Sequence, residues 1–162
     1  MSSLIEWTMS RMSALYSPQH SSAENTDTDA SAQLQTQFDS TFAADAEIHL
    51  NHTLVDYEQF KEFVKSRRTE STEVECKPED FIETPVEEGN ADSGSIVAGK
   101  VTLVRTHKFR IRVGRAKTTT VISFSAKIKQ TPEPRIVQLF QTSVDKPFQV
   151  NLNPRAVDAS AL

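Results

Sequence analysis

Four polar side chains stand where this 162-residue sequence could perform acid–base or binding chemistry. Arg105 and His107 interrupt a strand face that is otherwise apolar, and His52 ends another alternating segment. An imidazole can move a proton near neutral pH, and a guanidinium suits carboxylate or phosphate acceptors. We therefore take His107, His52 and Asp45 as candidate catalytic residues and Arg105 as a candidate ligand-binding residue.

Each candidate also has a purely structural alternative. A bulge would turn Arg105 and His107 to solvent, or a partner subunit would cover them. His52 would be a hydrogen-bonding loop histidine, although its position on the same side as Ile48 and Leu50 favours the mouth of a cavity. Asp45, which follows a short helical pattern, would satisfy backbone donors in a turn.

Large aromatic side chains recur at helical and strand spacing through the chain. The simplest interpretation is a packed core, and the alternative is the wall of an apolar ligand pocket with few polar anchors. The candidate ligand-contacting aromatics are Phe38, Phe42, Phe60, Phe124 and Phe140.

Helical spacing predicts the elements of the first half of the chain. Apolar residues at i, i+4 and i+7 predict a helix over 3–16, and a second, short helix from Leu34 is closed by 43–45. Residues 46–52 alternate as a strand. Asp56 followed by Gln59 is typical of a helix start, and that helix should end near Arg68.

The second half of the sequence is predicted to be β-structure. Residues 72–84 form a strand in which Pro78 cannot donate to a ladder, so this strand should be bulged or lie at an edge. Residues 95–113, 117–130 and 135–145 should form an antiparallel meander joined by short turns. Strands this long usually bend.

Length and composition predict one domain over 1–162. Within it, residues 17–31 contain no large apolar side chain and predict a polar insertion loop, and a tail begins at about 147.

Several function classes are disfavoured. The net charge of −4 argues against a nucleic-acid partner, and Cys76 is the single cysteine, so no Cys-rich metal site is expected. The four glycines form no phosphate loop, so no cofactor is expected. Without a long apolar run or an apolar leader we expect no membrane partner and a cytoplasmic location.

One pattern resembles a known family. It consists of Leu34, Phe38 and Phe42, then Asp45-Ala46, then Ile48, then a helix holding Tyr57, Phe60 and Phe63. This pattern, with the order of elements over roughly 1–145, resembles the nuclear transport factor 2-like superfamily and its SnoaL-like branch.

The resemblance implies an α+β cone, in which a strongly curved antiparallel sheet wraps around three N-terminal helices and leaves a pocket at the open end. It also implies homodimers that pair through the outer sheet face. Members include dehydratases, isomerases, cyclases and non-catalytic binders, so the fold assigns no reaction. The fungal dehydratases have two pocket histidines on the middle strands, where this chain has only His107.

Two hypotheses of function follow. In the first, the chain binds a small apolar or amphipathic molecule in its pocket, as an isomerase, dehydratase or cyclase would. In the second, it is a non-catalytic dimeric scaffold that works through its outer sheet face. An open cavity with Arg105, His107 or His52 pointing into it favours the first, and a filled cone favours the second.

Overall fold

The computed structural model describes residues 3–17, 27–111, 114–130 and 132–146. Three α-helices come from the first half of the chain: α1 (Leu4–Tyr16), α2 (Asp27–Thr41) and α3 (Tyr57–Thr69). The strands are β1 (Phe42–Leu50), β2 (Thr53–Val55), β3 (Ser71–Pro85), β4 (Ser95–Ile111), β5 (Gly114–Lys129) and β6 (Arg135–Lys146), and a 3-10 turn, η1 (Ala91–Ser93), precedes β4.

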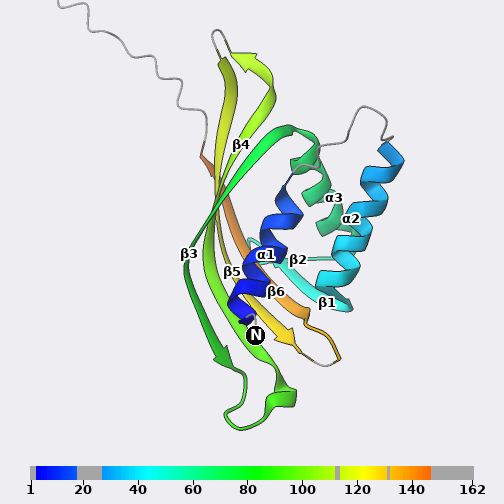
Figure 1. Cartoon of the computed structure of the whole chain (residues 1–162), viewed down its shortest axis with the longest axis vertical. Coiled ribbons are helices and arrows are strands. Elements are labelled where there is room, and N and C mark those ends of the chain that lie inside the picture. Colours follow the sequence, from blue (N-terminus) through cyan, green and yellow to red (C-terminus); the bar gives the residue numbers. More distant parts are fainter. Residues whose placement is uncertain (1–2, 18–26, 112–113, 131, 147–162) are drawn as a thin grey trace, which may run out of the picture.

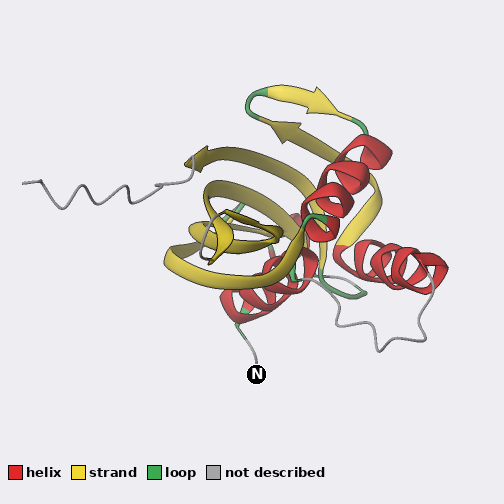
Figure 2. Ribbon diagram, turned by 90° about the horizontal axis from the view of Figure 1, so that it is seen from above, coloured by secondary structure: helices red, strands yellow, loops and turns green. Residues whose placement is uncertain are grey.

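The strands form one open, curved sheet in the order β2-β1-β6-β5-β4-β3. Figure 1 shows the helices gathered on one face of this sheet, and Figure 2 shows the long strands curving round them. The predicted α+β cone is therefore confirmed. The sheet is mixed rather than wholly antiparallel, because β1 returns to pair with β6 in parallel, while β4, β5 and β6 form the predicted antiparallel meander.

Local side-chain signals explain where two helices begin. Ser3 accepts from the backbone N–H of Glu6 and Glu6 accepts from that of Ser3, which forms a capping box at α1. Asp56 and Gln59 form the same reciprocal pair at α3, as the sequence predicts. These bonds satisfy N–H groups that have no partner within the helix.

Strand β3 lies at one edge of the sheet, where a proline can be accommodated because its missing N–H breaks no central ladder. Pro78 lies opposite Val101, and the register shifts between Glu79 and Ile82, where Asp80 has a φ of 54°. The prediction of an edge or bulged strand is confirmed.

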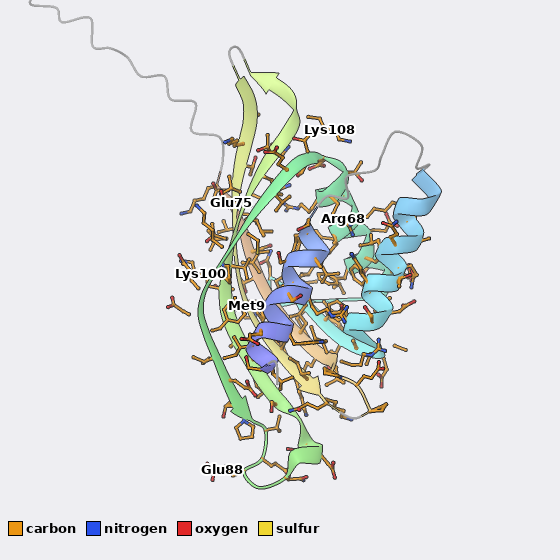
Figure 3. The ribbon with its side chains drawn as sticks, viewed as in Figure 1. Met9, Arg68, Glu75, Glu88, Lys100 and Lys108 are labelled. Atoms are coloured by element: carbon orange, nitrogen blue, oxygen red, sulfur yellow. The ribbon has the colours of Figure 1, made fainter. Side chains whose placement is uncertain are left out.

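The hydrophobic core fills the space between the helices and the concave face of the sheet. Strand alternation directs every second side chain inward, so Ile122, Phe124 and Ala126 of β5 are buried while Ser123 and Ser125 lie on the convex face. The convex face carries charges as well, and Figure 3 shows Glu75 and Lys100 pointing away from the helices.

Several boundaries differ from the sequence-based expectation. Helix α2 ends at Thr41 and β1 begins at Phe42, so residues 43–45 extend the strand instead of closing the helix. Residues 27–31, expected in the polar loop, form the start of α2, because a polar composition does not by itself prevent helix formation. The rest of that loop after Ser17, and the tail from 147, lie outside the described residues.

No helix in the described ranges combines the length and the apolar character needed to cross a bilayer.

Candidate functional site

Arg105 and His107 are buried on the helix-facing side of β4. Arg105 lies opposite Thr118 of β5, and the pairing of the two strands shifts only beyond Thr106. Arg105 is 3% exposed and His107 is 7% exposed. Charged and polar side chains are rarely buried so completely unless they are paired or functional.

These two side chains line a pocket of about 620 Å³. Its walls come from the last turns of α3 and from the neighbouring ends of β4, β5 and β6. The lining residues are Ser66, Arg67, Glu70, Arg105, His107, Thr118 and Asp145. All seven have polar side chains, so the pocket suits an amphipathic ligand better than a wholly apolar one.

Arg105 lies between two carboxylates. Its Nη2 donates a hydrogen bond to Thr120 Oγ1 at 3.2 Å and is 3.6 Å from Asp145 Oδ1, and its Nη1 is 3.9 Å from Glu70 Oε2. Burial lowers the pKa of Arg105 and so does the charge of Arg67, while Asp145 and Glu70 oppose that shift. A guanidinium keeps its charge in proteins, so the pocket holds a permanent buried cation.

Asp145 is the common acceptor for the positive groups of the pocket. Arg67 Nη1 donates to both carboxylate oxygens at 2.8 and 2.7 Å, and Thr120 Oγ1 donates to Oδ1 at 2.6 Å. Burial alone would raise the pKa of Asp145, but the bonds from Thr120 and Arg67 and the charges of Arg67 and Arg105 hold it below its usual value. Asp145 is therefore ionised at neutral pH.

His107 is held by two hydrogen bonds and is neutral at pH 7. Its Nε2 lies 2.7 Å from Thr118 Oγ1, and its ring also bonds to the backbone of Glu70. Burial lowers the pKa of His107 from its ordinary value of 6.5, and the charge of Arg105 lowers it further, against the opposing effects of Glu70. A neutral, oriented imidazole at a pocket wall is able to accept a proton.

Beside this pocket lies a second cavity of about 10 Å³, which shares Arg67 and Arg105 with it and is lined by both polar and apolar side chains. That volume corresponds to about one water-sized probe. Beside it Tyr16 accepts a hydrogen bond from Gln141 at 2.9 Å, and burial raises the pKa of Tyr16 to about 12.

The predicted aromatic residues do not line this pocket. Phe38, Phe42 and Phe60 are at most 2% exposed and pack on one another with ring centroids 5.4 to 5.7 Å apart. Phe124 packs edge-on against Phe81. They form solid core.

The remaining aromatic candidate, Phe140, lies on the opposite face of the sheet. It is 44% exposed and stacks on His49, with ring centroids 4.5 Å apart. Adjacent strand residues point to opposite faces, and its neighbours Leu139 and Gln141 are buried toward the helices.

His52 and Asp45 are not brought together with Arg105 and His107. Asn51 and His52 have φ values of 49° and 66° and reverse the chain between Leu50 and Thr53, so His52 lies exposed in a tight hairpin turn and not at a strand end. Asp45 is exposed on β1 instead of lying in a turn. Neither residue lines the pocket of about 620 Å³.

Sequence reasoning missed the acidic and hydroxyl partners of the site. Arg67 was expected only as a member of the helix that ends near Arg68, and Asp145 only as the end of a strand. Thr118 and Thr120 could have been found from the sequence. They lie on the same inward-facing side of the strand as Ile122 and Phe124, and they place hydroxyl groups on that otherwise apolar face. Polar residues on a core-facing alternation indicate either buried partners or a site.

Within the described residues, no group of three or more His, Cys, Asp or Glu side chains is placed to hold a metal ion.

Comparison with solved structures supports the fold. Mtr2 of Candida albicans superposes with a TM-score of 0.56 at 13% identity, and the match covers 89% of this chain and 96% of that one. A nuclear transport factor 2-like protein of unknown function from Exiguobacterium sp. 255-15 gives a TM-score of 0.51 at 18% identity, over 86% of this chain and 99% of that one. These likenesses confirm the predicted resemblance at the level of fold.

Mtr2 has also been solved as a complex with the Mex67 M domain, and that structure matches with the same TM-score of 0.56. No protein-family model and no curated protein sequence matches this chain.

Proposed function

We propose that this chain binds an amphipathic small molecule in the pocket between the end of α3 and strands β4, β5 and β6. The observation that carries the proposal is a polar pocket of about 620 Å³ whose wall contains two buried ionisable side chains, Arg105 and His107. Burying such groups costs free energy unless they are compensated, and functional sites are where that cost is commonly found.

The chemistry we propose for this pocket is proton transfer by His107. Isomerisation, dehydration and cyclisation can each begin with removal of a proton from a carbon next to a carbonyl group. The neutral imidazole would accept that proton at Nε2, in place of its hydrogen bond to the Thr118 hydroxyl, and Arg105 beside it would stabilise the negative charge that develops on the substrate. The two bonds that hold the His107 ring fix its orientation before substrate arrives.

A screen of small-molecule fragments by protein-observed NMR tests the proposal. We expect backbone amide shifts to cluster at Ser66, Glu70 and Thr118, and His107→Ala and Arg105→Ala to weaken the response to the fragments that bind there. His49→Ala, which removes an imidazole from the convex face, is the matched control. If the shifts of bound fragments fall elsewhere, or if both pocket variants bind as the unchanged protein does, the proposal is wrong.

A second function, a homodimeric scaffold, is favoured by a different observation. Large apolar side chains stand exposed on the convex face or its edge: Leu54 is 64% exposed, Phe140 44% and Val144 57%. Exposed apolar side chains that gather on one face mark interaction sites more often than isolated ones do. The complex of Mtr2 with the Mex67 M domain gives an example of a similarly folded protein that forms a complex with a partner.

Sedimentation velocity distinguishes the scaffold from a monomeric binder. We expect a concentration-dependent dimer that Phe140→Asp and Val144→Asp disrupt, because each substitution places a charge in the apolar contact. Gln33→Asp, at an exposed position of α2 away from the convex face, is the control for added charge. A monomer at all concentrations would rule out the homodimer.

A further inference from the structure

Arg105 has more hydrogen-bonding capacity than its surroundings use. A guanidinium carries five N–H groups. Among the described residues, only the Nη2 bond to Thr120 engages one of them, and Nε and Nη1 have no acceptor within hydrogen-bond distance. Because Arg105 is 3% exposed, these donors are cut off from most of the solvent as well. A buried donor without an acceptor is costly, so an acceptor supplied by a ligand would be strongly favoured.

The closest acidic group on the Nη1 side, Glu70, is only loosely held. Its carboxylate is 3.9 Å from Nη1, which is an ion pair but too long for a hydrogen bond, and its side chain is 57% exposed. The Ser66 hydroxyl donates a hydrogen bond of 3.4 Å to Oε1 of Glu70. Water or another anion can therefore readily replace the Glu70 carboxylate in its contact with Arg105.

Asp145, in contrast, is held by three short hydrogen bonds. It accepts from Arg67 and from Thr120 at 2.6 to 2.8 Å, and so it already neutralises one of the two arginines. If the Glu70 side chain turns out to solvent, Arg67 and Arg105 together carry one positive charge more than Asp145 balances, and Asp145 remains 3.6 Å from Arg105. That balance matches a monoanion better than a dianion.

We propose that the ligand of this pocket carries a carboxylate, which replaces the Glu70 side chain at Nη1 of Arg105. The inference rests on the proposed function, because it names the chemical class of the molecule that occupies the same pocket. Glu70 thus acts as an internal competitor that covers the arginine until the ligand arrives. The rest of the ligand lies in the pocket of about 620 Å³, beside His107 and Thr118, because the second cavity has room for only about one water-sized probe.

Three probes with one ring and different head groups test this inference with the full chain. Benzoate carries the carboxylate, benzamide is its neutral counterpart of nearly the same shape, and phenyl phosphate offers a dianion. We expect benzoate to shift the amide resonances of Glu70 and Thr118 and to bind at least about tenfold more tightly than benzamide, as a charge-assisted bond requires.

Two variants at the anchor should move benzoate binding in opposite directions. Arg105→Gln should weaken benzoate by about tenfold or more and leave benzamide unchanged. Glu70→Gln should strengthen benzoate by about threefold, because the competing charge is gone. The controls are Arg135→Gln, which removes a surface arginine paired with Glu133, and Glu73→Gln, which removes an exposed carboxylate from β3. Neither control should change binding.

The possible failures separate the two proposals. If benzoate and benzamide bind equally at the pocket, or if Glu70→Gln weakens benzoate, the carboxylate inference is overturned while the pocket stands. If phenyl phosphate binds more tightly than benzoate, the ligand class is a phosphate. If no probe shifts the pocket resonances at millimolar concentration, both proposals fail. If Arg105→Gln does not fold, Arg105→Lys replaces it as the test, because it keeps the positive charge. Arg105→Lys should weaken the binding of benzoate by less than the roughly tenfold expected for Arg105→Gln.

Discussion

Helix α3 touches two regions of opposite character at its two ends. Phe60, near its start, is fully buried among the rings of Phe38 and Phe42. Arg67 and Glu70, at its end, face an open pocket with Arg105. The first region stabilises the fold through buried apolar area and ring contacts. The second contains charges whose burial costs desolvation free energy.

The largest effect should come from the aromatic region. Phe38→Ala removes a fully buried ring and leaves a cavity, so we expect the free energy of unfolding to fall by about 3–5 kcal/mol. Chemical denaturation measures this fall. Phe140→Ala, at the exposed ring on the convex face, should cost less than about 1 kcal/mol. Equal losses for the two variants would contradict the division between solid core and surface.

A smaller effect is expected at the hydroxyl that links the pocket's charges. Thr120→Val keeps the shape but removes the acceptor for Arg105 and the donor to Asp145, which should cost about 1–3 kcal/mol. The pKa of Asp145 should rise, because its bond from Thr120 lowers it. Denaturation and an NMR titration of the carboxylate measure the two effects. Thr119→Val, on the opposite face of β5, should change neither the free energy of unfolding nor the pKa of Asp145. If Thr119→Val lowers stability as much as Thr120→Val does, the loss is not due to these bonds.

Helix α3, which connects the two regions, should be destabilised by removing its N-terminal cap. Asp56→Ala deletes the side chain that accepts from the Gln59 backbone at 2.7 Å, and we expect a loss of about 1 kcal/mol. Asp45→Ala, at an exposed strand position, should cost less than about 0.5 kcal/mol. A loss from Asp56→Ala no greater than that from Asp45→Ala would show that the cap does not stabilise the helix.

The smallest effect concerns the protonation of His107. Its pKa is lowered by folding, so the unfolded chain takes up the proton first as the pH falls below about 6.5. The folded protein should therefore lose stability from about 6.5 down to the lowered pKa and no further through this group. Replacement by His107→Gln should flatten the stability profile over that window. An unchanged slope would mean that His107 titrates alike in both states.

The sequence predicts best those features that depend on residues close together in the chain. The Asp56–Gln59 cap is local, so its residue types were sufficient. The strand meander was predictable because alternation and turn residues repeat along the chain. His52 was misplaced because the alternation of β1 was continued into a turn. Asn51, a residue that tolerates a positive φ, was the available clue to that turn.

The site itself needed information that is not local. Arg67, Arg105 and Asp145 come from a helix and two strands far apart in the sequence, and only the register of β4, β5 and β6 brings them together. Residue type also could not separate a packed aromatic core from an aromatic pocket wall, because both require the same apolar side chains. The distinction depends on how completely the rings fill the cone.

The carboxylate site is best tested by a crystal structure of the protein soaked with benzoate. We expect electron density for the carboxylate within hydrogen-bond distance of Arg105 Nη1, the ring beside His107 and Thr118, and the Glu70 side chain turned toward solvent. An empty pocket at saturating benzoate, or benzoate bound only on the convex face of the sheet, would contradict it.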